Sequence, residues 1–206
     1  MRRANTQLQA DRRTEILDAA QTCFARSGFH QASMHEICAE ANMSPGNLYR
    51  YFPSKEAIIA GICERDRAEA VESFRAVHQA PDFFTGLEGL ARFHLVERTA
   101  EEVGLCAEIM AESRRNPEIA RVYQDVERDI KARLAAMLQR AADGGEGRRD
   151  LDLASAATVL LVLADGISWR RAVDPNFDPQ KVLPMLLHMV GCLLGKSYVD
   201  GGEPSR

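Results

Sequence analysis

Residues 33–57 read SMHEICAEANMSPGNLYRYFPSKEA, and this stretch decides the fold. Ser33 and Glu36, three residues apart, form the capping box that begins a helix. Ser44 begins the next helix as its N-cap, and Pro45 takes the first helical position, where its missing N–H costs nothing. Each helix spans about two turns and about three residues separate them, which is the geometry of a helix-turn-helix.

The two faces of this helix pair differ in chemistry. Apolar side chains can close the inner face: Ile37, Ala41, Met43, Leu48 and Phe52. The outer face of the second helix is rich in hydrogen-bonding groups: Pro45, Gly46, Asn47, Tyr49 and Arg50, with Tyr51 on its flank. Arginine bonds guanine and asparagine bonds adenine in bidentate fashion, and a helix N-terminus favours phosphate. Periodicity alone leaves two interpretations open, DNA binding and ordinary three-helix packing.

The remainder of the chain also has the pattern of helices, and no segment alternates as a strand does. Gly28 ends a first helix expected at 10–27, and Pro53 with Ser54 separates the third helix from a long fourth at 55–77. Later helices are expected at 83–100, 104–114, 117–142, 152–173 and 178–197. We therefore expect an all-α protein with a three-helix helix-turn-helix unit (1–54), a six-helix body (55–200) and a disordered tail (201–206).

Composition excludes several other classes of protein. The 206 residues are 46% hydrophobic with a net charge of −4, which is ordinary for a soluble domain with a real core. No run approaches the ~18 apolar residues of a membrane helix, and the N-terminus lacks the apolar core of a secretory signal, so a cytoplasmic location is expected. The five cysteines show no metal-ligand spacing, so neither a metal nor a cofactor is expected. Motifs of catalysis are absent, which disfavours an enzyme.

Three stretches resolve the choice that periodicity leaves open. Residues 13–20 (RTEILDAA), 24–29 (FARSGF) and 43–57 (MSPGNLYRYFPSKEA) closely resemble the TetR family of bacterial transcriptional regulators. The resemblance covers about residues 12–60 without a gap, whereas the rest matches mainly in helix count and length.

The resemblance implies an all-α homodimer that binds a palindromic operator, with a small-molecule site in the body and a dimer bundle made by the last two helices. Carried over by position, the family's DNA contacts fall on Ser33, His35, Ser44, Gly46, Asn47, Tyr49, Tyr51 and Lys55. Pro45 and Arg50 share that outer face and complete the expected DNA-binding set. Many relatives have Lys where this chain has Pro45, so one phosphate or base contact of the family is missing. Many have Thr where it has Asn47, so the family's base preference does not carry over at that position.

The body offers three candidate ligand-binding residues. Asp165 follows the apolar run 160–164, where a carboxylate is costly unless it is paired. A cationic ligand or Arg170 of a partner subunit could pair with it, and partial exposure at the bundle end is the alternative. Glu108 and Trp169 are the other candidates.

The apolar faces of 153–169 and 182–194 are wider than one core-facing stripe requires. They belong either to a fully buried helix or to a dimer interface. We expect an interface containing Leu160, Leu163, Met185, Met189 and Leu193. The predicted protein is thus a ligand-released repressor that acts as a homodimer on double-stranded DNA, with an activator or co-regulator as the alternative.

Overall fold

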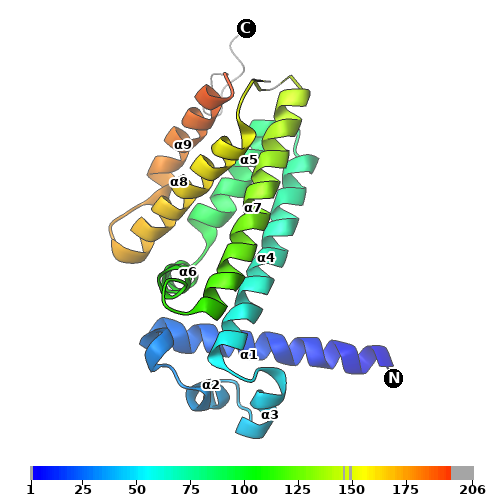
Figure 1. Ribbon diagram of the computed structural model, residues 1–206, viewed down its shortest axis with the longest axis vertical. Helices are drawn as coiled ribbons and strands as arrows, with labels where there is room; N and C mark the ends of the chain where they lie inside the picture. The colour runs from blue at the N-terminus through cyan, green and yellow to red at the C-terminus, as the bar shows by residue number, and fades with distance from the viewer. Residues whose placement is uncertain (1, 146, 149, 196–206) are drawn as a thin grey trace. The chain divides into compact units, whose positions relative to one another are not determined.

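The computed structural model describes residues 2–145, 147, 148 and 150–195. In these residues all regular secondary structure is helical, as expected (Figure 1). The α-helices are α1 (Arg2–Gln31), α2 (Met34–Glu40), α3 (Pro45–Tyr51), α4 (Lys55–Gln79), α5 (Phe83–Arg92), α6 (Ala100–Glu112), α7 (Pro117–Asp143), α8 (Leu153–Val173) and α9 (Pro179–Leu193). A π-helical segment, η1 (Phe93–Glu97), follows α5 directly.

The helices differ from the sequence expectation at a few ends. α1 begins at Arg2 instead of residue 10, and it resumes for a turn after Gly28, whose φ of 74° and ψ of 160° break the helical path. The helix expected at 83–100 divides into α5 and the π-helical segment η1. α9 ends at Leu193, and the expected tail at 201–206 lies outside the described residues.

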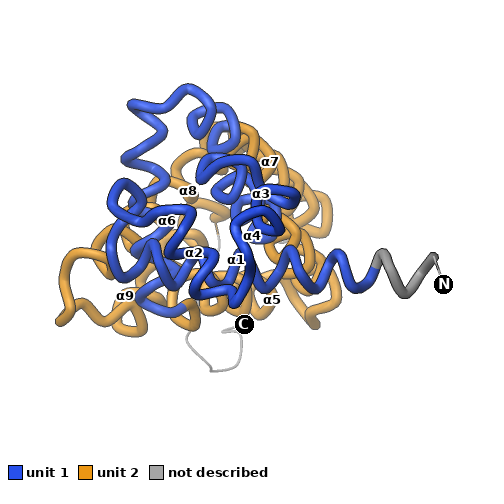
Figure 2. Tube along the Cα trace, turned by 90° about the horizontal axis from the view of Figure 1, so that it is seen from below, with its two compact units in different colours: residues 1–66, 99–124 blue, residues 67–98, 125–206 orange. Residues whose placement is uncertain are grey.

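The chain forms two compact units, shown in different colours in Figure 2. Unit 1 comprises residues 1–66 and 99–124, and unit 2 comprises residues 67–98 and 125–206. This division does not follow the boundary expected at 54/55. The reason is that α6, which sequence patterns assign to the body, packs against α1.

Unit 1 is built around the apolar faces of α1 to α4. Its largest fully buried side chains include Ile16, Phe24, Ile37, Leu48, Phe52, Ile58 and Ile62. Gly61 allows the close approach of α4, because a Cβ atom there would lie 2.9 Å from both Leu17 Cδ2 and Phe52 Cε1. The two short helices are therefore fixed on a rigid base.

Unit 2 has a separate apolar core. It gathers side chains from the second part of α4 and from α5, η1, α7, α8 and α9, among them Phe74, Leu90, Leu95, Met137, Leu138, Leu160, Leu183, Leu187 and Val190. Gly86 lies so close to α4 that a Cβ atom would stand 2.8 Å from Val77 Cγ1 and 2.9 Å from Val77 O. Removal of apolar surface from water on this scale is what stabilises the bundle.

Candidate nucleic-acid interface

The turn between α2 and α3 follows from its local sequence. The Ser33 hydroxyl accepts the Glu36 N–H at 3.2 Å, and the Glu36 carboxylate accepts the Ser33 N–H at 2.7 Å, which is the predicted capping box. The Ser33 bonds hold the pKa of Glu36 below its usual range. Asn42 has φ 51°, a left-handed conformation that asparagine tolerates, and the Met43 N–H donates to Cys38 O at 2.9 Å. α3 is thereby fixed against α2.

α3 turns one side inward and presents the other. Leu48 is fully buried, while Tyr49 is 51% exposed. The other expected DNA contacts that are exposed are Ser33, His35, Ser44, Pro45, Gly46 and Arg50. Asn47, Tyr51 and Lys55 are half-buried. Among the described residues, Arg50 has no ion-pair or hydrogen-bond partner, so its guanidinium is free to meet a base.

Ser44 departs from its expected capping role. Its hydroxyl makes no capping hydrogen bond to the described backbone, whereas the Ser54 hydroxyl accepts the Ala57 N–H at 3.2 Å as expected. The Ser44 hydroxyl is therefore available to another acceptor or donor at the N-terminus of α3.

Arg13 of α1 secures the far end of α3. Its guanidinium lies over the Phe52 ring, 4.4 Å from the centroid, and its Nη1 donates to Tyr51 O at 3.4 Å. The cation thereby satisfies a carbonyl at the C-terminal end of the helix. This contact spans 38 residues of sequence, so sequence patterns did not reveal it.

Lys55 was expected to contact the DNA backbone, but in the structure its ammonium group binds the protein backbone. Its Nζ donates to three backbone oxygens at the end of α1: Phe29 O at 2.7 Å, Ala32 O at 2.9 Å and His30 O at 3.2 Å. An ammonium group has three donors, so all of them are engaged. In this structure Lys55 therefore holds the α1–α2 corner.

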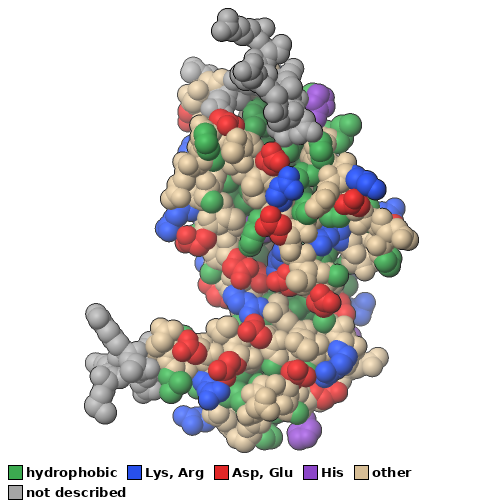
Figure 3. Space-filling view, turned by 180° about the vertical axis from the view of Figure 1, so that it is seen from behind, with side chains coloured by type: hydrophobic (Ala, Val, Ile, Leu, Met, Phe, Trp, Pro, Cys, Tyr) green, Lys and Arg blue, Asp and Glu red, His purple; other side chains and the backbone are tan. Residues whose placement is uncertain are grey.

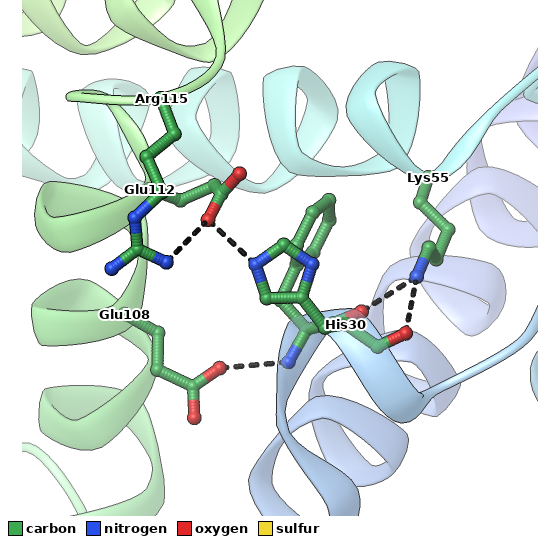
Figure 4. A network of polar contacts seen from close by, with 6 residues as sticks. His30, Lys55, Glu108, Glu112 and Arg115 are labelled. Carbon is green, nitrogen blue, oxygen red and sulfur yellow. Dashed lines mark hydrogen bonds and ion pairs between the residues drawn. The ribbon is translucent and has the colours of Figure 1, made fainter.

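α6 contacts the same corner with two carboxylates (Figure 4). Glu108 Oε2 accepts the Phe29 N–H at 2.8 Å, and Glu112 Oε2 lies 2.8 Å from His30 Nε2. Glu112 is the one charged residue in the buried class among the residues described, and Arg115 Nη1 stands 3.8 Å from the same oxygen. Glu108, a predicted ligand contact, thus has its carboxylate bound to the α1–α2 corner.

Comparison with known proteins shows what this arrangement belongs to. The model described as "Bacterial regulatory proteins, tetR family" matches residues 16–62, and "BetI-type transcriptional repressor, C-terminal" matches residues 90–195. The regulator UidR of Escherichia coli K12 is 36% identical over 158 residues, covering 75% of this chain and 79% of the relative. The structure of Salmonella enterica GusR superposes with a TM-score of 0.78 at 34% identity, covering 90% of this chain and 96% of that one.

The chain belongs to the TetR family of bacterial transcriptional regulators. A further relative, the nicotine-responsive repressor HdnoR of Paenarthrobacter nicotinovorans, is 27% identical over 177 residues, covering 82% of this chain and 88% of the relative. The protein is therefore a helix-turn-helix transcriptional regulator and not an enzyme.

In unit 2 of this TetR-family regulator, Asp165 is a half-buried carboxylate on α8. It makes no hydrogen bond or ion pair with any described residue. Burial raises the pKa of Asp165, and the nearby charge of Glu127 raises it further. Trp169, one turn further along α8, is 48% exposed. The carboxylate is thus an acceptor without a donor.

Unit 2 also contains a histidine that sequence reasoning did not single out. His94, in η1, has its Nε2 3.0 Å from Ser73 Oγ on α4. Burial lowers the pKa of His94 to about 4, with the charge of Arg98 as a second cause. Arg171 of α8 binds the backbone of the same segment, because its guanidinium donates to Leu95 O at 3.0 Å and to Arg98 O at 2.8 Å. Ser73 and Arg171 lie 21 and 76 residues from their partners in sequence, so no local pattern signalled these contacts.

The outward faces of α8 and α9 are apolar. The exposed members are Val159, Val162, Trp169 and Val173 on α8, and Met185 and Met189 on α9. Of the expected interface residues, Leu160 lies in the core of its own unit and Leu163 and Leu193 are half-buried. One residue along a helix is a rotation of about 100°, so Val159 rather than Leu160 faces outward.

α8 is also the one helix in the described part of the chain that is long and apolar enough to cross a membrane by length and composition. TetR-family regulators are soluble DNA-binding proteins, so this apolar surface has another explanation.

Proposed function

We propose that this regulator is a cytoplasmic repressor that binds a palindromic operator as a homodimer and is released by a small-molecule effector bound in unit 2. The observation that carries the proposal is the outer face of α3. There Tyr49 and Arg50 are exposed on a short helix that the unit 1 core holds rigidly.

The chemistry of this face suits a major groove. A guanidinium without a protein partner can bond guanine, and the N-terminus of α3 favours a phosphate. Gly46 leaves open space, since a Cβ atom there would meet no atom within 4 Å. Figure 3 shows acidic and basic side chains interspersed over one face of the protein. We infer that the contacts of α3 bring more to operator binding than does a general positive field.

The test is selection of bound sequences from random duplex DNA, followed by affinity measurement at a stated salt concentration. An inverted repeat with half-sites about 34–36 Å apart is expected, because two recognition helices enter successive major grooves. Absence of enrichment from folded, dimeric protein, before and after the protein is unfolded, stripped of ligand and refolded, would overturn the DNA-binding assignment. A reporter behind the selected operator then distinguishes repression from activation.

The proposed dimer is formed by the outward faces of α8 and α9 pairing with those of a second copy. These faces are lined by three valines, one tryptophan and two methionines, and each of these residues is 47% to 62% exposed. Exposed apolar patches of this kind mark interaction sites on soluble proteins. A second copy is the occupant that fits, because an isologous pairing buries one face against itself and supplies the two-fold axis of a palindrome.

The effector site is proposed at Asp165. An ionised carboxylate is an acceptor only, so its ligand has to bring donors, as an ammonium group or several hydroxyls would. The nicotine-responsive name of one relative fits a ligand with a basic nitrogen. Nicotine, choline and a panel of sugars serve as probes in a thermal-shift assay, with Asp165→Asn as the matched variant. A stabilising compound that acts equally on both proteins would exclude Asp165 as a contact.

A further inference from the structure

The corner between α1 and α2 is held from two sides, all within unit 1. Gly28 breaks α1, so the Phe29 N–H leaves the helical hydrogen-bond pattern. Glu108 of α6 accepts that N–H at 2.8 Å, and Lys55 of α4 takes the carbonyls of Phe29, His30 and Ala32. Ser33, the N-cap of α2, follows immediately. The start of the helix-turn-helix is therefore positioned by one carboxylate and one ammonium group.

α6 lies in unit 1, but the chain on both sides of its segment belongs to unit 2. Unit 1 takes residues 99–124 from the middle of the sequence, and both ends of that segment continue into unit 2, at 98 and at 125. α6 is thus covalently continuous with the unit proposed to bind the effector, while its Glu108 is bonded to the corner that begins the DNA-binding helices.

We propose that Glu108 is the positioning residue through which α6 and the helix-turn-helix are energetically coupled. Its bond to the Phe29 N–H ties any displacement of α6 to the start of α2, and the reverse holds because coupling between sites is reciprocal. Glu112 makes a second contact from α6 to this corner, through the side chain of His30. That side chain is 67% exposed, so water can replace Glu112 as its partner more easily than it can replace Glu108 at the Phe29 N–H. This inference rests on the proposed function, because it concerns the regulation of the same DNA-binding site.

The test compares Glu108→Ala with Glu108→Gln, whose amide oxygen still accepts a hydrogen bond. Glu101→Ala removes an exposed carboxylate from the same helix, where no described residue bonds it, and is the matched control. Amide exchange resolved at single residues is measured with and without the operator selected above. In the wild type and in Glu108→Gln, operator binding should slow exchange in α6 at least threefold. In Glu108→Ala that response should vanish and the Phe29 amide should exchange at least tenfold faster.

Operator affinity is the second readout. Glu108→Ala should weaken binding about tenfold with an unchanged salt slope, because phosphate contacts are intact and only their positioning is lost. Glu108→Gln and Glu101→Ala should stay within threefold of the wild type. An α6 exchange response that survives in Glu108→Ala overturns the inference, and so does a loss that Gln fails to rescue. If no operator is selected at all, the proposed function fails instead, and the two failures are thereby distinct.

Discussion

The outer face of α3 and the outer faces of α8 and α9 are both exposed, yet their chemistry is opposite. α3 presents a phenol, a guanidinium and an uncommitted serine hydroxyl, whereas α8 and α9 present valines, a tryptophan and methionines. Polar groups without protein partners can form hydrogen bonds with the edges of bases, whereas exposed apolar groups are stabilised when a second protein surface buries them. Exposure alone therefore identifies no partner; the chemistry of the exposed groups does.

The strongest way to break this comparison is to make the apolar face polar. Val162→Glu places a charge in the proposed interface, so the dimer should dissociate and operator affinity should fall about 1000-fold, as expected when one half-site is bound instead of two. Sedimentation gives the oligomeric state and DNA titration the affinity. Gln124→Glu, an exposed change on α7, is the control and should leave both unchanged. A dimeric Val162→Glu protein would refute the interface.

The polar face should respond in the opposite manner. Tyr49→Ala combined with Arg50→Ala should lower operator affinity about 100-fold, since each lost base or phosphate contact costs about 1–3 kcal/mol. The dimer should persist, because neither side chain lies on α8 or α9. DNA titration and sedimentation on the same sample separate the two effects. Wild-type affinity in this double variant would mean that α3 is not the recognition helix.

The buried imidazole of His94 provides a test of the interior of unit 2. Its pKa is lowered to about 4 by burial, so the folded protein keeps the imidazole neutral while the unfolded chain binds a proton near its ordinary value of about 6.5. Its contribution is complete above about pH 6.5 and is lost as pH falls toward 4. It amounts to about 3 kcal/mol, because each unit of pKa shift is equivalent to about 1.4 kcal/mol.

Denaturant unfolding between pH 7 and pH 4 measures this contribution. His94→Leu should flatten the pH dependence, and Ser73 retains Glu69 O as an acceptor for its hydroxyl in that variant. His78→Gln, which changes an exposed histidine of the same unit, should keep the wild-type slope. Equal slopes for the wild type and His94→Leu would contradict the assignment.

The finest comparison uses two serines at helix starts. Ser33→Ala removes an observed cap and should cost about 1 kcal/mol of stability. Ser44→Ala removes a hydroxyl that caps nothing described, so stability should be unchanged while operator affinity falls about threefold, a smaller loss than a base contact gives. Thermal unfolding and DNA titration of both variants decide this, and destabilisation by Ser44→Ala would show a capping role.

Local sequence predicted most of the helices and the caps at Ser33 and Ser54, although not the start of α1 or the missing cap at Ser44, because capping boxes, proline starts and apolar periodicity act over a few residues. The turn at Asn42, the buried Leu48 and the cap at Ser54 all follow from neighbours in sequence. The π-turn at 93–97 was missed, because an apolar helical pattern does not by itself separate a single π-turn from an α-helix.

The long-range partners were also missed. Lys55 meets Phe29 across 26 residues, and Glu108 meets it across 79. Nothing in the spacing of these residues signals that contact. A glycine that breaks a helix just before a capped one was the only local sign that an orphan N–H needed a partner.

The discontinuous composition of unit 1 has a practical consequence for building chimaeric regulators. Exchanging residues 1–54 between relatives would separate α1 from the α6 that it packs against, and it would leave Glu108 facing a foreign corner. We therefore expect a transplanted module to keep these contacts only if it includes residues 1–66 together with 99–124. The compact unit that carries the DNA-binding helices consists of two chain segments, and a fusion designed at a single crossover would divide it.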